Sequence, residues 1–376
     1  MNKPLRIGIL GGGQLGRMLL QSAANYNVET FVLESGKNPP ASSLCHHFIE
    51  GDINNYESVY NFGKKVDVLT IDIEHVNLDA LFKLEEEGIK IFPRPRTLKI
   101  IKDKGLQKEF YKKHHIPTPH FHLINQRKEL QKHLSFFPVA QKLRSGGYDG
   151  KGVEILRAEK DIQNAFDAPS IIESLVDIQK EISVIVAKNE TGKETVYPPV
   201  EMVFDNRYHL VDYLVSPADI DESLALKAQE IALDVMNAFD SPGIFAVEMF
   251  IDSNNNILVN ETAPRTHNSG HQSIEGNYCS QYDMQMRVLQ GLPLGDTSIT
   301  KPSLMLNLIG EPNYAGPVKY EGLEEAMLLK DVYIHIYGKH ETRPGKKMGH
   351  VTIVGKKKTE LLEKAKTIKQ LIRVIS

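Results

Sequence analysis

Short apolar runs alternate with more polar stretches through the first hundred residues of the chain. The apolar runs are four to eight residues long, which is the usual length of a strand. The predicted elements are, in chain order, a strand at 5–10, a helix at about 15–25, strands at 28–34 and 66–73, a helix at 78–87 and a strand at 89–92. This alternation is typical of a parallel sheet with helices on both faces. We therefore expect an α/β, doubly wound domain over residues 1–98.

The pattern changes at Pro93-Arg94-Pro95, after which a basic helix is predicted to about residue 115, and Pro117 and Pro119 mark a second boundary. The elements expected beyond it are strands at 137–143, 153–156, 170–173, 181–187, 194–203 and 209–215, a helix at 220–238, a hairpin at 243–261, a helix at 280–290, a strand-rich segment at 304–354 and a charged helix at 358–373. We therefore expect a small α+β domain over residues 99–178. A larger α+β domain is expected over residues 179–376, ending in a strand-rich subdomain.

Composition narrows the class of protein. The 376 residues suit two or three domains, and the 45 basic and 48 acidic residues leave a net charge of −3. A chain without a basic excess is not expected to bind nucleic acid nonspecifically. Two cysteines, Cys45 and Cys279, cannot form a disulfide framework, so a reducing cytoplasm is expected. Neither a signal peptide nor a membrane-spanning run is predicted.

A glycine-rich turn links the first predicted strand to the first helix. Gly11-Gly12-Gly13-Gln14-Leu15-Gly16 fits G-x-G-x-x-G, and Glu34 closes the next strand. In a Rossmann-like domain these glycines let a phosphate approach the N-terminus of the helix. The motif therefore predicts phosphate binding by a Rossmann-like domain. A tight turn without a ligand is one alternative. A nicotinamide-dependent oxidoreductase is another, although nothing later in the chain suggests hydride chemistry.

A second glycine-rich segment lies between two predicted strands. It reads Arg144-Ser-Gly-Gly-Tyr-Asp-Gly-Lys-Gly-Val153, and Lys142 precedes it on the first strand. It is not a P-loop, because no helix follows and Lys151 is followed by glycine. A glycine-rich hairpin can close over a triphosphate with its backbone N–H groups, and a lysine beside it supplies a positive charge. We interpret the segment as a nucleotide lid, with an ordinary flexible hairpin as the alternative.

Two acids are predicted to face each other across the hairpin at 243–261. If Asn254-Asn255 is a two-residue turn, Glu248 lies directly opposite Glu261. Cross-strand neighbours on one face have Cβ atoms about 5 Å apart, so the carboxylates would repel each other unless a cation bridged them. Mg²⁺ prefers carboxylates together with phosphate oxygens. The pair therefore predicts a magnesium site, and two separately paired acids are the alternative.

Residues 260–271 read Asn-Glu-Thr-Ala-Pro-Arg-Thr-His-Asn-Ser-Gly-His, a run of polar groups that would each need a partner if buried. His267 and His271 have the spacing of a helical zinc pair, but Asn-Ser-Gly between them argues against a helix. Arg265 and Asn268-Ser269 better suit an anionic, polar substrate. Together the sites imply ATP·Mg²⁺ and a second substrate. That layout suits activation of a carboxylate as an acyl phosphate followed by attack of an amine.

Four segments resemble the ATP-grasp superfamily and, within it, the family of N5-carboxyaminoimidazole ribonucleotide synthetases. They are GGGQLGRM at 11–18, GGYDGKG at 146–152, NETAPRTHNSGH at 260–271 and RPGKKMGH at 343–350. The resemblance implies an ATP-grasp fold in which the domain at 99–178 is the lid. It also implies that ATP phosphorylates bicarbonate to carboxyphosphate and that the amine of aminoimidazole ribonucleotide captures the carboxyl group or CO₂ released from it. Mg²⁺ is the implied metal, with Mn²⁺ as an alternative, and the implied assembly is a homodimer.

The resemblance also assigns roles to individual residues. It places the ATP contacts at Lys104, Lys142, Gly147, Tyr148, Asp149, Gly150, Lys151, Gly152, Val153, Glu173, Ser174, Leu175, Val176, Glu181, Asn260 and Glu261. It places the ribonucleotide contacts at Gln14, Glu74, Tyr148, Arg265, His267, Asn268, Ser269 and Lys346. The metal ligands are Glu248 and Glu261, and the catalytic groups are Asp149, Lys339 and Arg265. Asp149 would accept the amine proton or orient the amine, and Lys339 would hold an anionic intermediate.

Three rival functions stay open at this point. The first is another ATP-grasp ligase, such as a formate-dependent glycinamide ribonucleotide formyltransferase. The second is the nicotinamide-dependent oxidoreductase suggested by residues 11–16 and Glu34. The third is a non-catalytic nucleotide sensor, against which the intact Asp149 and the Glu248/Glu261 pair argue.

Overall fold

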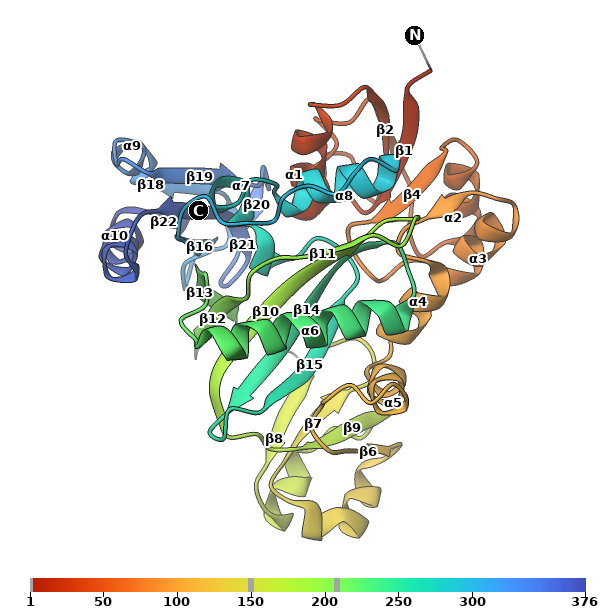
Figure 1. Ribbon diagram of the computed structural model, residues 1–376, viewed down its shortest axis with the longest axis vertical. Coiled ribbons are helices and arrows are strands. Elements are labelled where there is room, and N and C mark those ends of the chain that lie inside the picture. Colours follow the sequence, from red (N-terminus) through yellow and green to blue (C-terminus); the bar gives the residue numbers. More distant parts are fainter. Residues whose placement is uncertain (1–2, 148–151, 206–209) are drawn as a thin grey trace.

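The computed structural model describes residues 3–147, 152–205 and 210–376. Its N-terminal part is a parallel sheet with strand order β3-β2-β1-β4-β5 (Figure 1). The strands are β1 (Leu5–Leu10), β2 (Val28–Glu34), β3 (His47–Glu50), β4 (Val68–Ile71) and β5 (Lys90–Ile91), and the helices are α1 (Gln14–Ala23), α2 (Tyr56–Gly63) and α3 (Leu78–Glu86). The predicted doubly wound sheet is confirmed. The sequence did not predict β3 or α2.

The predicted basic helix after the proline segment is two helices rather than one. These are α4 (Pro95–Ile101) and α5 (Lys104–Lys113). The chain breaks between them because the side chain of Asp103 accepts hydrogen bonds from the backbone N–H groups of Gly105 and Leu106, which is an N-cap. Arg144 donates to the same carboxylate at 2.7 Å. The cap therefore fixes where α5 starts and ties it to the strand that precedes the second glycine-rich segment.

A small antiparallel sheet with strand order β6-β9-β7-β8 follows, and it lies at the bottom of Figure 1. Its elements are β6 (Phe121–Ile124), the 3₁₀ segment η1 (Arg127–Phe136), β7 (Val139–Leu143), β8 (Val153–Leu156), η2 (Glu159–Asn164) and β9 (Ser170–Ser174). The second glycine-rich segment connects β7 to β8, as predicted. Of its residues, Tyr148, Asp149, Gly150 and Lys151 lie outside the described part of the chain.

The largest sheet runs β15-β14-β10-β12-β13-β16-β21-β19, with β11 paired to β10. Its strands are β10 (Ile178–Lys188), β11 (Glu194–Val196), β12 (Val200–Asp205), β13 (Leu210–Ser216), β14 (Gly243–Asp252), β15 (Ile257–Ala263), β16 (Ser303–Ile309), β19 (Val332–Ile336) and β21 (Lys347–Val354). The predicted strand at 194–203 is wrong as a single strand. It is interrupted at Pro198-Pro199, where neither residue has an N–H group for the ladder.

Helices cover the largest sheet and join it to the rest of the chain. They are α6 (Glu222–Phe239), α7 (Ser273–Gly276), α8 (Gln281–Gln290), α9 (Leu323–Met327) and α10 (Lys358–Leu371), with η3 at Asn268–Gly270. The short strands β17 (Gly316–Pro317), β20 (Glu341–Thr342), β18 (Lys319–Glu321) and β22 (Arg373–Ile375) form two further pairs. The predicted domain limits at 98 and 178 stay a prediction.

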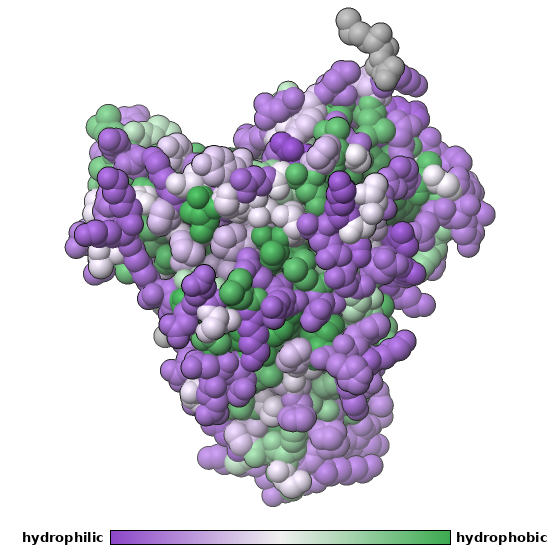
Figure 2. Space-filling model, in the orientation of Figure 1, coloured by the Kyte–Doolittle hydropathy of each residue, from purple (hydrophilic) through white to green (hydrophobic). Residues whose placement is uncertain are grey.

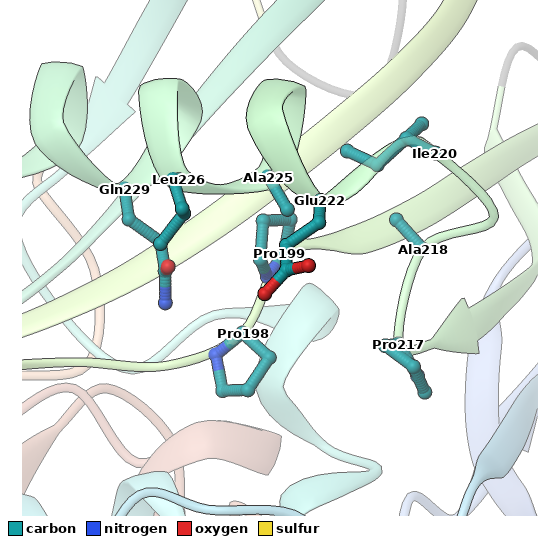
Figure 3. Close-up of a pocket in the computed structure, with 9 residues that line it drawn as sticks. All are labelled: Pro198, Pro199, Pro217, Ala218, Ile220, Glu222, Ala225, Leu226 and Gln229. Atoms are coloured by element: carbon teal, nitrogen blue, oxygen red, sulfur yellow. The ribbon is translucent and has the colours of Figure 1, made fainter.

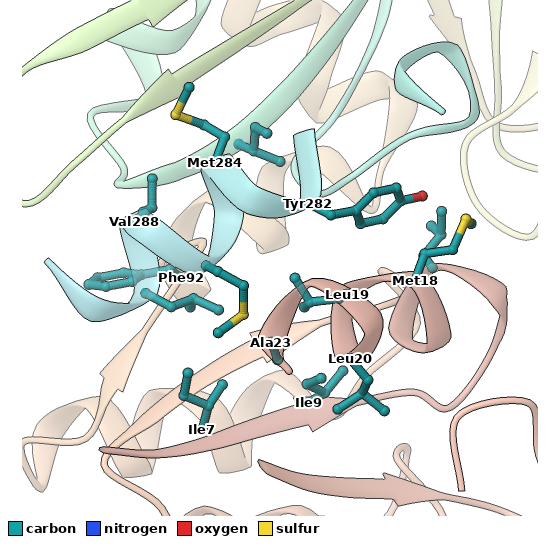
Figure 4. Packing of buried hydrophobic residues seen from close by; sticks show 14 of the residues in the cluster. Ile7, Ile9, Met18, Leu19, Leu20, Ala23, Phe92, Tyr282, Met284 and Val288 are labelled. Atoms are coloured by element: carbon teal, nitrogen blue, oxygen red, sulfur yellow. The ribbon is translucent and has the colours of Figure 1, made fainter. Parts of the chain in front are cut away.

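Helix α8 packs against α1 and holds the N-terminal sheet on the large one. Figure 4 shows Met18 and Leu19 of α1 and Tyr282 of α8 in one buried apolar cluster, with Met284 and Val288 on the side of α8 that points away from α1. Figure 2 shows hydrophilic residues over most of one face, with apolar residues in small separate patches. None of the helices within the described residues has the length and apolar character needed to cross a membrane.

Candidate active site

A buried glutamate and two lysines form an ionic network where the small sheet meets the large one. Glu173 lies on β9, Lys142 on the neighbouring strand β7, and Lys108 on α5. The Glu173 carboxylate is 2.6 Å from the Nζ atom of each lysine. Burial alone would raise the pKa of Glu173, but the two ammonium groups outweigh it and lower that pKa to about 2. Glu173 is therefore ionised at neutral pH and fixes both lysines in place.

The lysines extend this network to strand β15. Lys142 Nζ lies 2.8 Å from Asn260 Oδ1, and Lys104 Nζ contacts a carboxylate oxygen of Glu261. Three ammonium groups therefore converge on the junction between α5, β7 and β15. Such a cluster suits a polyanion such as a triphosphate. Lys108 was not predicted from the sequence. Its position one helical turn after Lys104 was a signal, but helical spacing alone does not reveal that a lysine is buried.

Strands β14 and β15 bring the two predicted metal ligands face to face. Glu248 pairs directly with Glu261, which confirms the predicted register at this point. The predicted two-residue turn is wrong, because Ile251 pairs with Ile257 and Asp252 N–H donates to Asn256 C=O. A register shift between Glu248 and Met249 compensates by adding one residue, Asn260, to β15. A bulge of this kind re-aims side chains, so that consecutive residues Asn260 and Glu261 both face the lysines.

The two carboxylates have opposite electrostatic environments. Burial and the nearby Glu261 charge raise the pKa of Glu248 to about 8. The ammonium of Lys104 lowers the pKa of Glu261 to about 2. Burial also raises the pKa of Glu181, on the adjacent strand β10, to about 7. The site therefore holds more partly buried acid than its own cations neutralise, which is the condition that a bound divalent cation relieves.

These residues fit Mg²⁺ in the form in which it accompanies nucleotides. In the part of the chain that the structure describes, no three His, Cys, Asp or Glu side chains are grouped to hold a metal. Glu248 and Glu261 would supply two carboxylates with Asn260 beside them, and phosphate oxygens would supply further ligands. Mg²⁺ is characteristically held in this way by one or two carboxylates plus substrate phosphates.

Residues 173–176, which the family resemblance gives as ATP contacts, connect the two sheets. Ser174 ends β9 and its N–H donates to the carbonyl of His120, while Leu175 is exposed and Val176 is half-buried. Because the Glu173 carboxylate is occupied by two lysines, a base bound here would meet the backbone of this segment rather than that side chain. Gly147 and Gly152, with Val153 at the start of β8, flank the four residues outside the described part.

Arg265 lies farther along the polar strip (residues 260–271), beyond the predicted metal ligand Glu261. Its Nε atom lies 2.9 Å from Glu74 Oε1. Asp72, also buried, accepts a hydrogen bond from the backbone N–H of Gly13 at 2.5 Å. Burial raises the pKa of Asp72 to about 6, although the charge of Arg265 opposes the rise. Glu74 and Arg265, each predicted to contact the ribonucleotide, are thus brought together, and Asp72, which was not predicted, lies near them.

The glycine turn at the start of α1 does not support the predicted phosphate site. Gly12 N–H donates to the Glu34 carboxylate at 3.0 Å, and Gly13 N–H donates to Asp72. Two backbone donors that a phosphate would need are therefore already bound to carboxylates. These negative charges would also repel a phosphate. The positive φ of Gly11, +102°, fits the tight turn that was the alternative interpretation.

Gln14 nevertheless reaches a second predicted residue from the opposite end of the chain. Lys339 Nζ donates to Gln14 Oε1 at 2.9 Å and to the carbonyl of Lys347 at 2.6 Å. Its ammonium also lies 5.5 Å from the ring centre of Tyr337. Lys346, one residue before Lys347, is half-buried and donates to the carbonyl of Glu341 at 2.7 Å. The basic segment at 343–350 therefore faces the start of α1.

Residues 267–269 of the strip link the predicted metal ligands to the rest of the site. His267 Nε2 lies 3.3 Å from Glu248 Oε1, and its Nδ1 lies 2.9 Å from Ser269 Oγ. Ser269 Oγ in turn lies 2.8 Å from Ser183 Oγ. Asn268 behaves differently, because its side-chain amide exchanges two hydrogen bonds with that of Asn307. His267 and Ser269 are thus placed within the site, whereas Asn268 fixes the strip to strand β16.

Three histidine rings stack behind the strip and support it. His350 lies between His335, at 4.3 Å between ring centres, and His271, at 4.8 Å. His271 Nδ1 is 2.9 Å from the Tyr282 hydroxyl, and His350 Nδ1 is 3.1 Å from the Tyr337 hydroxyl. His271 therefore contributes to packing in this structure. Burial lowers the pKa of His271 and of His350 well below 6.5.

We expect the stability that His350 contributes to be lost in acid. The unfolded histidine binds a proton below about pH 6.5 and the buried one does not, so falling pH favours unfolding. The difference in unfolding free energy between wild type and His350→Asn should shrink by about 1.4 kcal/mol per pH unit between roughly pH 6 and 5. Urea denaturation at each pH measures it. Exposed His120→Asn serves as control, and a difference independent of pH for His350→Asn would contradict the expectation.

A surface pocket elsewhere does not fit a nucleotide. It has a volume of about 230 Å³ and lies against α6 (Figure 3). Prolines and apolar side chains line much of it, and its charged lining residue is Glu222. An acidic, proline-lined pocket has no group to neutralise a phosphate. The polar groups described above are therefore the better candidate for the site.

Family models match three consecutive parts of the chain. They describe a ribonucleotide synthetase preATP-grasp domain at residues 4–102, an ATP-grasp domain at 109–282 and a phosphoribosylaminoimidazole carboxylase C-terminal domain at 303–364. The predicted ATP-grasp fold is thereby confirmed.

Solved structures and a curated relative extend the match to nearly the whole chain. N5-carboxyaminoimidazole ribonucleotide synthetase from Thermotoga maritima is 41% identical, with a TM-score of 0.92 and 99% of each chain covered. N5-carboxyaminoimidazole synthase from Aspergillus clavatus, in complex with ADP and 5-aminoimidazole ribonucleotide, is 33% identical, with a TM-score of 0.90 and 99% of each chain covered. Chloroplastic phosphoribosylaminoimidazole carboxylase of Vigna aconitifolia is 36% identical, and the match covers 93% of this chain but 64% of that relative.

Proposed function

Because the chain belongs to the ATP-grasp family of N5-carboxyaminoimidazole ribonucleotide synthetases, we propose that it carboxylates aminoimidazole ribonucleotide with ATP and bicarbonate. The products are the N5-carboxylated ribonucleotide, ADP and phosphate, and the step belongs to purine biosynthesis. The observation that carries the proposal is one continuous strip. Asn260 and Glu261 meet the lysines, and Arg265, four residues later, meets Glu74. A phosphate donor and an anionic acceptor bound at the two ends would be held side by side.

The first half of the reaction is assigned to the lysine end of the strip. Lys104 and Lys142 hold the phosphates, and Glu248 and Glu261 hold Mg²⁺, which neutralises phosphate charge when bound. A bicarbonate oxygen attacks the γ-phosphorus, and the bond to ADP breaks. The nucleotide base lies against residues 173–176, with Glu181 near its ribose. Because phosphoryl transfer needs mainly positioning and charge neutralisation, the convergence of three ammonium groups supports this assignment.

The second half is assigned to the arginine end. The ribonucleotide amine attacks the carboxyl carbon of carboxyphosphate, phosphate leaves, and the amine gives up a proton. Arg265, His267, Ser269, Gln14 and Glu74 orient the ribonucleotide. Lys339 holds the anionic intermediate, and Lys346 contributes a positive charge. The proton acceptor is proposed to be Asp149, which lies outside the described residues. The contact between Lys339 and Gln14 supports this half. It brings together two predicted site residues that are 325 residues apart in the sequence.

Substrate choice provides the test of this function. We expect ADP release with aminoimidazole ribonucleotide plus bicarbonate, and none above background with glycinamide ribonucleotide plus formate. Coupled measurement of ADP release with each pair compares the two directly. Release only with the second pair would sink the proposal and favour the formyltransferase. An NAD(P)H fluorescence titration serves as control for the oxidoreductase. No binding is expected, because the donors of Gly12 and Gly13 are occupied.

Assembly and location are part of the same proposal. We propose a homodimer, which sedimentation velocity of the purified chain would test. We also propose a cytoplasmic protein, in keeping with Cys45 and Cys279, both of which are free thiols in the structure.

A further inference from the structure

Lys108 is the most deeply buried charged residue of the network around the phosphate site, together with its partner Glu173. Each side chain is 2% exposed. A lysine is almost never fully buried unless it is paired, because the charge loses its hydration. Burial lowers the pKa of Lys108 to about 8, so the group keeps its proton at neutral pH. Neither its helix nor the local sequence explains why a charge is placed here.

The ammonium group of Lys108 has three acceptors, two on strands and one in the loop between α5 and β6. Its Nζ atom lies 2.6 Å from Glu173 Oε1 on β9, 2.6 Å from Thr118 Oγ1 and 3.2 Å from the carbonyl of Val259 on β15. A lysine has three N–H donors. All three are therefore used within the protein, so Lys108 has none left for a ligand. It differs in this respect from Lys104, which reaches the carboxylate of Glu261 on the proposed metal site.

Each of the two strand partners of Lys108 contacts, or is next in sequence to, a group in the proposed ATP site. Glu173, held by Lys108 through Oε1, holds Lys142 through Oε2, and Lys142 reaches Asn260. Val259 immediately precedes Asn260 and Glu261 on β15. Thr118 donates to the same carbonyl of Val259 at 2.7 Å, which reinforces that link. Lys108 thus fixes the spacing between β9 and the metal-binding end of β15.

We propose that Lys108 is a positioning residue for ATP binding. It holds Lys142 and the Asn260–Glu261 pair at the distance needed to bind the phosphates. The inference rests on the proposed ATP site. Without Lys108, Glu173 would keep Lys142 as its one buried counter-ion in this network, and Lys142 would be drawn toward Glu173 and away from the phosphates. The loss would fall on nucleotide binding. The ribonucleotide end of the strip, around Arg265, would keep its own contacts.

The test compares ADP affinity among three variants of the full chain. Lys108→Met should weaken binding of ADP with Mg²⁺ by roughly tenfold or more, measured by isothermal titration calorimetry. Thr118→Val, which removes one acceptor without removing the charge, should weaken it by a few fold. Lys112→Met lies one turn later on α5, where the side chain is exposed, and should leave it unchanged. In steady-state assays Lys108→Met should raise the KM for ATP and leave that for the ribonucleotide nearly unchanged.

The outcomes separate this inference from the proposed function. A folded Lys108→Met protein with wild-type ADP affinity, or with both KM values raised alike, would overturn the positioning role. If Lys108→Met does not fold, Thr118→Val decides, and unchanged ADP affinity in that variant overturns the inference. A wild-type chain that binds no ADP would instead contradict the proposed function and the inference with it. Urea denaturation of each variant identifies loss of folding.

Discussion

Replacing Glu261 by Gln is expected to lower the rate of ADP release by roughly 10³-fold, the equivalent of several kcal/mol in the barrier. The change keeps the shape of the side chain but removes one of the two facing carboxylates of β14 and β15. Mg²⁺ prefers charged oxygen ligands, so its hold on the phosphates weakens. Lys104 also loses its counter-charge. Turnover measured across a magnesium titration, with ATP, bicarbonate and the ribonucleotide all saturating, provides the measurement.

Folding should survive this change, which makes the loss interpretable. The Glu261 side chain is 40% exposed and that of Lys104 25%, so the pair resembles a surface ion pair worth about 0–1 kcal/mol. Removing one of two facing acids also relieves repulsion with Glu248. The matched control is Glu190→Gln, which breaks an exposed ion pair with Lys90 and should keep wild-type turnover. Near-normal turnover by Glu261→Gln at low magnesium would contradict the metal assignment.

The sequence predicted well those strands that contain a clear apolar run. Strands β1 and β2 begin and end at the predicted residues, because each contains a short apolar run, Ile-Gly-Ile-Leu in β1 and Phe-Val-Leu in β2, as expected for parallel strands covered on both faces. Strand β3, His-Phe-Ile-Glu, lies at the sheet edge with exposed ends and lacks that signal. Helix α2 begins at an Asn55 cap, which indicates a helix start only once the surrounding fold is known.

The candidate site was predictable only where its groups are close in sequence. The pairing of Glu248 with Glu261 needed the register of one hairpin, and the correct pair emerged despite a wrong turn because a bulge added a residue. Lys108 and Asp72 depend instead on packing between distant elements. Lys108 is buried by β9 and β15, and Asp72 accepts from Gly13, which is 59 residues away. Composition and spacing carry no information about such contacts. The occupancy of the amides in the motif at 11–16 was unpredictable for the same reason, because the acids that accept from them come from the ends of β2 and β4.

Replacing Arg265 by Lys is expected to lower kcat/KM for the ribonucleotide by roughly 10²-fold while the KM for ATP stays near its wild-type value. Lysine keeps the positive charge that Glu74 and Asp72 require, so no buried acid is left without a cation. Lysine lacks the planar guanidinium with which arginine can donate hydrogen bonds to Glu74 and to an anionic group at the same time. The measurement is ADP release with each substrate varied in turn.

Arg265→Lys is informative about the strip because it is expected to lower kcat/KM for the ribonucleotide without changing the KM for ATP. Arg265 lies four residues beyond Glu261, and among the described residues it contacts Glu74 and the carbonyl of Thr266 rather than a lysine of the phosphate network. A defect confined to the ribonucleotide would mean that the strip serves two substrates through separate ends. If the KM for ATP rose as much as kcat/KM for the ribonucleotide fell, Arg265 would belong to the phosphate site instead. Lys112→Met, with its charge change remote from the strip, controls for a general effect of altering a basic residue.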